Sequence, residues 1–153
     1  MITPSPTTKI DPKLARGTLG SAHEATATKP AYLVLDLPNT SYQLHLQPVG
    51  GLASVQGVEP GKRLIGTIVA RARRVDVPGT GGRYVEPVAG RPRRVQGRVI
   101  AVEQGRLVVD AGVPIHCELT DARQKPEQFP LGVIVSFDVL DGATFARESG
   151  ARE

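Results

Sequence analysis

Arginine is the residue type in this chain whose number and spacing could do chemistry. Of the nineteen Lys and Arg side chains, fourteen are Arg. Residues 62–106 hold eleven basic and three acidic side chains, a net charge of +8. A guanidinium group presents its N–H donors in a planar fork that matches phosphate oxygens two at a time. This block is therefore the candidate surface for a phosphate-bearing polyanion.

The rest of the chain does not share this excess of positive charge. Residues 1–61 hold four basic and four acidic side chains, and residues 107–153 hold four basic and eight acidic ones. A +8 block beside a −4 block favours recognition of a polyanion such as RNA or DNA. It also allows a second interpretation, in which the basic block of one copy docks on the acidic block of another. A genome rich in G and C would enrich Arg without either function.

The candidate contacts come from two strands and the loop between them. Arg71 and Arg73 share one side of a strand, and Arg94 and Arg98 share one side of another, because side chains alternate along a strand. If the two strands pair antiparallel across the 78–92 loop, all four guanidinium groups lie on one outer face. We expect each to contact phosphate with little sequence specificity. The full predicted set is Arg71, Arg73, Arg74, Arg83, Arg91, Arg93, Arg94 and Arg98.

The scarcity of aromatic residues argues against binding of single-stranded nucleic acid by base stacking. Single-stranded nucleic acids usually stack their bases on aromatic side chains. Aromatic residues make up 4% of the chain and there is no Trp. Tyr84 is the one aromatic residue inside the basic block, whereas Phe137 and Phe145 alternate with apolar neighbours and are expected in the core.

The sequence contains no recognisable catalytic or metal-binding pattern. The Gly-rich loop at residues 78–83 lacks the Gly-Lys-Ser/Thr ending of a phosphate-binding loop. His116 and Cys117 are adjacent, so a strand would point them to opposite faces, and Cys117 is the single cysteine. We expect Cys117 to be a small buried residue. The sequence thus predicts a binding module with no enzymatic activity, cofactor or metal.

The elements that must position the arginines are short strands separated by Gly- and Pro-rich turns. Residues 1–29 are rich in Thr, Pro, Ser and Ala and predict a flexible tail. Residues 32–37 and 42–47 alternate around a turn and predict a hairpin with Leu44 and Leu46 in the core. Asp141-Gly142 is typical of a second hairpin turn. The other expected strands span residues 64–77, 93–103, 106–110, 113–119, 133–139 and 143–146, with a short helix within 120–130.

These elements predict an all-β fold, a small barrel or sandwich with one short helix and an added N-terminal hairpin. From Leu64 onwards, the order of a long strand and further strands, a short helix and two more strands resembles an OB-type barrel, in which a helix lies between the third and fourth strands. The resemblance covers about residues 64–147. It implies one domain over residues 30–148, followed by a frayed end at 149–153.

The location of the protein can also be predicted from the sequence. No apolar segment follows basic residues near the N-terminus as in a signal peptide, and no apolar run approaches the length that spans a bilayer. A single cysteine suits a reducing compartment. We therefore expect a cytoplasmic protein without a membrane partner, which binds nucleic acid or, as the alternative, another protein or a second copy of itself.

Overall fold

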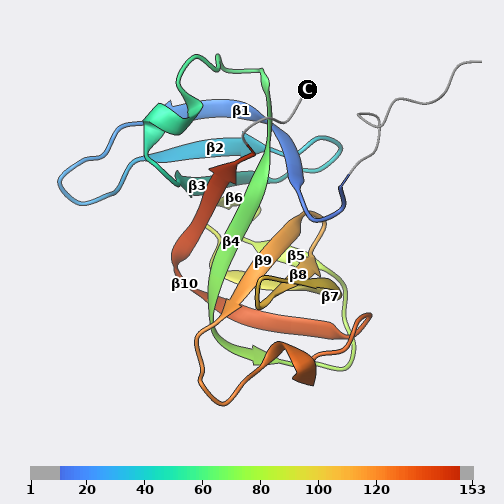
Figure 1. Cartoon of the computed structure of the whole chain (residues 1–153). Coiled ribbons are helices and arrows are strands. Elements are labelled where there is room, and N and C mark those ends of the chain that lie inside the picture. The colour runs from blue at the N-terminus through green and yellow to red at the C-terminus, as the bar shows by residue number, and fades with distance from the viewer. Residues whose placement is uncertain (1–10, 149–153) are drawn as a thin grey trace, which may run out of the picture.

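The computed structural model describes residues 11–148, and these form one mixed β-sheet that curls into rings (Figure 1). Its strands are β1 (Ala15–His23), β2 (Tyr32–Asp36), β3 (Gln43–Pro48), β4 (Arg63–Asp76), β5 (Tyr84–Glu86), β6 (Ala89–Gly90), β7 (Arg94–Glu103), β8 (Arg106–Asp110), β9 (Pro114–Leu119) and β10 (Ile134–Arg147). Two helical turns complete the described chain, η2 (Leu52–Val55) and η3 (Pro126–Gln128). None of its helical segments has the length and apolar character that a membrane crossing requires.

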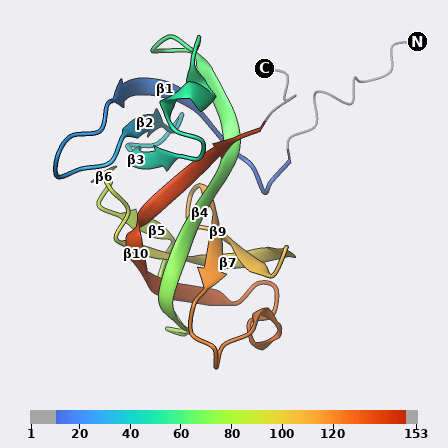
Figure 2. The ribbon, with the colours of Figure 1, turned by 60° about the vertical axis from the view of Figure 1, so that its left-hand side comes forward.

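The strands close two rings that share the β4–β10 pair. In one ring, β1, β2 and β3 connect β4 to β10 through antiparallel pairs and one parallel β3–β10 pair. In the other, which we call the second ring, β9, β8 and β7 connect β4 to β10, with β4 and β9 parallel. Figure 2 shows one ring above the other, with β4 and β10 running through both. The all-β prediction is confirmed.

Strand β10 serves both rings because it bends at Asp141-Gly142. Both residues have left-handed φ angles, 60° and 76°, which Asp and Gly adopt more readily than most residues. The register with β4 shifts between Leu140 and Ala143, so the two residues form a bulge within one strand. The predicted hairpin turn at this position is wrong, since the same two residues that allow a tight turn also allow a bulge.

Part of the predicted tail is a strand. Residues 15–23 pair with both β2 and β4, and Ala15, Gly17 and Leu19 alternate toward the core. Their small size hid the alternation, because Gly17 and the neighbouring Thr and Ser residues carry little hydrophobic signal. Residues 1–10 and the predicted frayed end at 149–153 lie outside the described residues.

The two strands that carry most of the arginines do not pair with each other. The hairpin of β2 and β3 forms as predicted, and Ile68, Ala70 and Ala72 of β4 face the core. However, β10 lies between β4 and β7 and pairs antiparallel with both. The short strand β5 occupies the other edge of β7. The expected β4–β7 pair across the 78–92 loop is therefore wrong.

The short helix expected within 120–130 is a single helical turn, η3, in the second half of that range. The side-chain amide of Gln124 donates to the Val75 carbonyl at 2.7 Å, and its oxygen accepts from the Val75 N–H at 2.8 Å. The Thr120 hydroxyl donates to the Ala72 carbonyl at 2.6 Å. These bonds hold residues 120–125 along the end of β4 and satisfy its backbone, so no helix forms there.

The core fills the interiors of the rings. Phe137 and Phe145 are fully buried as predicted, one on each side of the β10 bend. Cys117 is also fully buried, and burial raises the pKa of its thiol. Gly97 allows β7 and β8 to approach closely, because a Cβ atom there would collide with the backbone carbonyl of Asp110.

Gly97→Ala is expected to lower the free energy of unfolding by about 1–3 kcal/mol, because the methyl group forces β7 away from β8. Gly82→Ala is the matched control, since nothing lies within 4 Å of the added Cβ atom. Urea denaturation of both variants measures the difference. Equal stabilities would show that the β7–β8 approach is not constrained by this glycine.

Candidate functional site

The eight predicted arginines lie on the outer side of the rings, on β4, on β7 and in the segments that precede β5 and β7. Arg71 and Arg73 project from β4, and Arg94 and Arg98 project from β7, with β10 between them. In a ring of five strands the outward direction turns by about 72° per strand. The two arginine pairs therefore face different directions instead of sharing one flat face.

Aspartates from the acidic C-terminal block lie among the arginines. Arg94 pairs with Asp138 at 2.7 Å, and Arg71 approaches Asp141 to 3.4 Å. A further pair joins Arg83 to Asp110 at 2.7 Å. The two charge blocks that are separate in the sequence are thus interleaved on the surface.

Four arginines gather around the bend of β10, and we call Arg71, Arg91, Arg93 and Arg94 the arginine cluster. A depression of about 470 Å³ is lined by Arg91, Arg93 and Arg94 together with Asp138 and Asp141. The aliphatic stem of Arg91 lies over Gly142, where a Cβ atom would come within 2.7 Å of its Cδ. Hydrogen bonds with Tyr84 and Asp138 raise the pKa of Arg94, which keeps its charge fixed. Four guanidinium groups face two carboxylates here, which leaves a net charge of +2.

The remaining predicted arginines lie outside this cluster. Arg74 approaches Asp76 to 3.6 Å, and Arg98 donates to the Gly132 carbonyl at 2.8 Å. Arg73 is exposed on β4 and forms no ion pair with another residue of the described range. The structure thus places Arg91, Arg93 and Arg94 around one depression and Arg71 across β10 from them, linked through Asp141, and it spreads the other four around the second ring.

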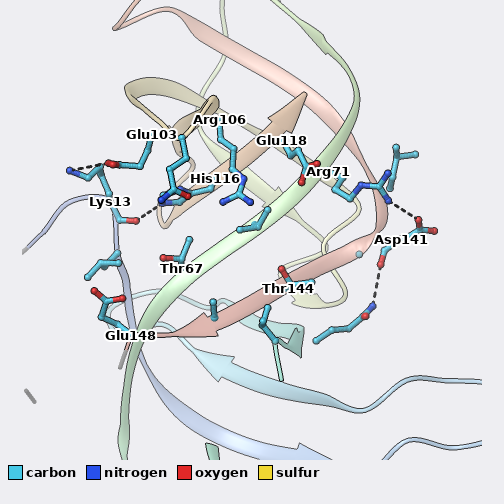
Figure 3. A pocket seen from close by; sticks show the side chains of 18 of the residues that line it. Lys13, Thr67, Arg71, Glu103, Arg106, His116, Glu118, Asp141, Thr144 and Glu148 are labelled. Carbon is cyan, nitrogen blue, oxygen red and sulfur yellow. Dashed lines mark hydrogen bonds and ion pairs between the residues drawn. The ribbon is translucent and has the colours of Figure 1, made fainter. Parts of the chain in front are cut away.

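A groove of about 850 Å³ runs along the outer side of β4, where the two rings meet (Figure 3). Arg71 and Asp141 lie at one end, while Lys13 pairs with Glu103 at 3.5 Å toward the other. The Nε2–H of the buried His116 donates to the Lys13 carbonyl at 2.8 Å and anchors the segment before β1. Five carboxylates and three Lys or Arg side chains line the groove, so it disfavours phosphate.

A third feature, absent from the sequence-based prediction, is a stack of three rings on the outer side of β1, β2 and β3. The centroids of His23 and Tyr32 are 4.6 Å apart with an interplanar angle of 14°. Those of Tyr32 and His45 are 4.9 Å apart at 18°. We call these residues the ring ladder. The alternation that places Leu44 and Leu46 in the core turns His45 outward, but His23 falls in the predicted tail, so the sequence does not reveal the alignment across three strands.

The ring ladder lies among positive charges. The ammonium group of Lys29 is 4.8 Å from the centroid of the Tyr32 ring. Burial and, after it, the charges of Lys29 and His23 lower the pKa of His45 below the ordinary histidine value. His45 is therefore a neutral ring at neutral pH, and the Lys29 ammonium is the fixed charge beside the ladder.

Within residues 11–148 there is no group of three or more His, Cys, Asp or Glu side chains that could hold a metal ion. Comparisons with protein-family models, with curated proteins and with solved structures found no match for this chain. The candidate site therefore rests on the geometry of the chain itself.

Lys29→Gln is expected to raise the pKa of His45, because it removes one of the charges that oppose imidazole protonation. NMR titration of the His45 ring measures the change, and Lys62→Gln is the control with the same loss of charge. Since the folded state holds this proton more weakly than the unfolded chain, wild-type stability should fall as the pH drops below the ordinary histidine pKa. An unchanged His45 pKa in Lys29→Gln would contradict the assigned cause.

Proposed function

We propose that this chain is a non-catalytic module that binds a polyanion, most naturally RNA or DNA, through the arginine cluster. The observation that carries the proposal is the gathering of Arg71, Arg91, Arg93 and Arg94 around the bend of β10. Their net excess of positive charge borders an open depression instead of a closed core. Phosphate groups that run past the bend would meet guanidinium groups from β4, from the loop before β7 and from β7 itself.

The aspartates within the cluster do not prevent this binding. The side chains of Asp138 and Asp141 are 62% and 87% exposed, so their ion pairs are screened by water. Exposed pairs of this kind contribute at most about 1 kcal/mol each. A phosphate that accepts two hydrogen bonds from one guanidinium group can replace such a carboxylate.

The expected recognition is of backbone charge and not of base sequence. Guanidinium contacts to phosphate fix the position of a nucleic acid but carry no direct sequence information. Arg73, Arg74, Arg83 and Arg98 would add weaker contacts as the strand continues around the second ring. Affinity should then depend steeply on salt, because each contact releases counterions.

We also propose that the second ring is OB-like, with its strands permuted. Counted from β7, it has three antiparallel strands, the helical turn η3 and then β10. The fifth strand, β4, comes before the others in the chain and pairs with β9 and β10. Moving that strand to the end leaves the helical turn between the third and fourth strands, as in the OB-type order. Such rings commonly bind nucleic acids on their outer surfaces and loops.

The test compares two triple variants that remove the same net charge. Arg71→Gln, Arg91→Gln and Arg94→Gln together should weaken binding to RNA and DNA oligonucleotides at least about tenfold and reduce the salt slope by about 2. Arg63→Gln, Arg106→Gln and Arg123→Gln, all outside the predicted set, form the control. Fluorescence anisotropy at several salt concentrations measures both effects. Equal losses in the two variants, or no binding by the wild type, would remove the proposal.

A second candidate function, binding of a protein or a second copy, is favoured by the groove along β4. Its carboxylates are complementary in sign to the arginine cluster of another molecule. Analytical ultracentrifugation at low ionic strength should then show an average mass that rises with protein concentration. About 0.5 M salt should return the mass to that of one chain. A mass of one chain throughout the titration would exclude this form of self-association.

A further inference from the structure

The ring ladder offers a surface that the arginine cluster lacks. His23 and Tyr32 are direct cross-strand partners on β1 and β2, and His45 follows on β3 one step along the diagonal. The Ser21 hydroxyl lies 2.8 Å from Nε2 of His23 and fixes the plane of that ring. His23 ends the ladder and is exposed. Three nearly parallel rings thus end in a flat face that is open to solvent.

The register of the sheet places the ladder beside the arginine cluster. Leu46 of β3 is paired with Ala143 of β10, so His45 stands next to Gly142, the residue that Arg91 covers. Gln47, two residues after His45, donates to the Asp141 carbonyl at 3.2 Å. Neighbouring strands are about 4.8 Å apart, so β1, which carries His23, is about 15 Å from β10 along the sheet. One bound strand of nucleic acid can reach both features.

We propose that the ring ladder stacks the bases of a single-stranded nucleic acid whose phosphates contact the arginine cluster. The inference rests on the proposed function and adds the class of ligand. Aromatic and histidine rings stack unpaired bases of any sequence. The bases of a duplex are already stacked on one another and cannot lie on the His23 face without leaving the helix. Lys29, beside Tyr32, provides a further phosphate contact at the ladder.

Two probes of equal length and charge separate stacking from charge. One is an oligothymidylate of about 12 nucleotides, and the other is the same backbone without bases. Wild-type protein should bind the oligothymidylate at least about fivefold more tightly than the abasic chain, since each stacked base adds to the affinity. A duplex of the same length should bind no more tightly than expected from its charge.

Substitutions of His23, at the exposed end of the ladder, test whether its ring provides the stacking surface. His23→Ala should bring the affinities for the two probes close together, and His23→Phe should restore the preference, because it keeps a ring without the imidazole. Gln43→Ala, at an exposed position on β3, is the control and should keep the wild-type preference. His23 lies at the end of β1, so these changes leave the core intact, and circular dichroism verifies the fold.

The outcomes distinguish the two proposals. Equal binding of the abasic and base-bearing probes by the wild type overturns the stacking inference and leaves polyanion binding in place. A preference that persists in His23→Ala overturns the assignment to the ladder. If the wild type binds none of the oligothymidylate, the abasic chain and the duplex, both proposals are overturned together.

Discussion

The antiparallel pairing of β4 with β10 is the interaction on which the rest of the structure depends. The two strands are matched at nine positions from Ser136 and Asp76 to Arg147 and Gly66, and each ring closes on this shared pair. The bulge at Asp141-Gly142 lets the first half of β10 pair with β7 and the second half with β3. A straight β10 could not serve both partners, so the bend is part of the fold and not a local irregularity.

The same bend determines the electrostatics of the surface. By placing β10 between β4 and β7, the fold carries Asp138 and Asp141 from the acidic block into the middle of the basic one. Charge that is segregated along the chain is therefore only partly segregated in space. What remains is a local excess at the bend, where Arg91 and Arg93 join Arg71 and Arg94, with a groove of opposite net charge immediately beside it.

Local patterns in the sequence predicted most strands and their buried faces, but not how distant strands meet. The alternation around Leu44 and around Ala70 is a property of a few consecutive residues, and it was confirmed. The insertion of β10 between β4 and β7 joins it to segments about 70 and about 40 residues away in the chain, which alternation cannot encode. Asp141-Gly142 favours left-handed backbone in a turn and in a bulge alike. Prediction of the ring ladder requires the register of three strands, and one of them, β1, has too few large apolar residues to be recognised as a strand from the sequence.

The arginine cluster and the ring ladder differ in how their contributions to affinity should respond to salt concentration. Contacts between guanidinium groups and phosphates weaken with salt because counterions are released on binding, and partial neutralisation by Asp138 and Asp141 limits their strength. Stacking of a base on a ring neutralises no phosphate, so it adds little to the number of counterions released. A ligand that uses both would be held in position by charge and retained by its bases. The fold thus places a salt-sensitive and a salt-insensitive contact on neighbouring strands, and the β10 bend is what brings them within reach of one ligand.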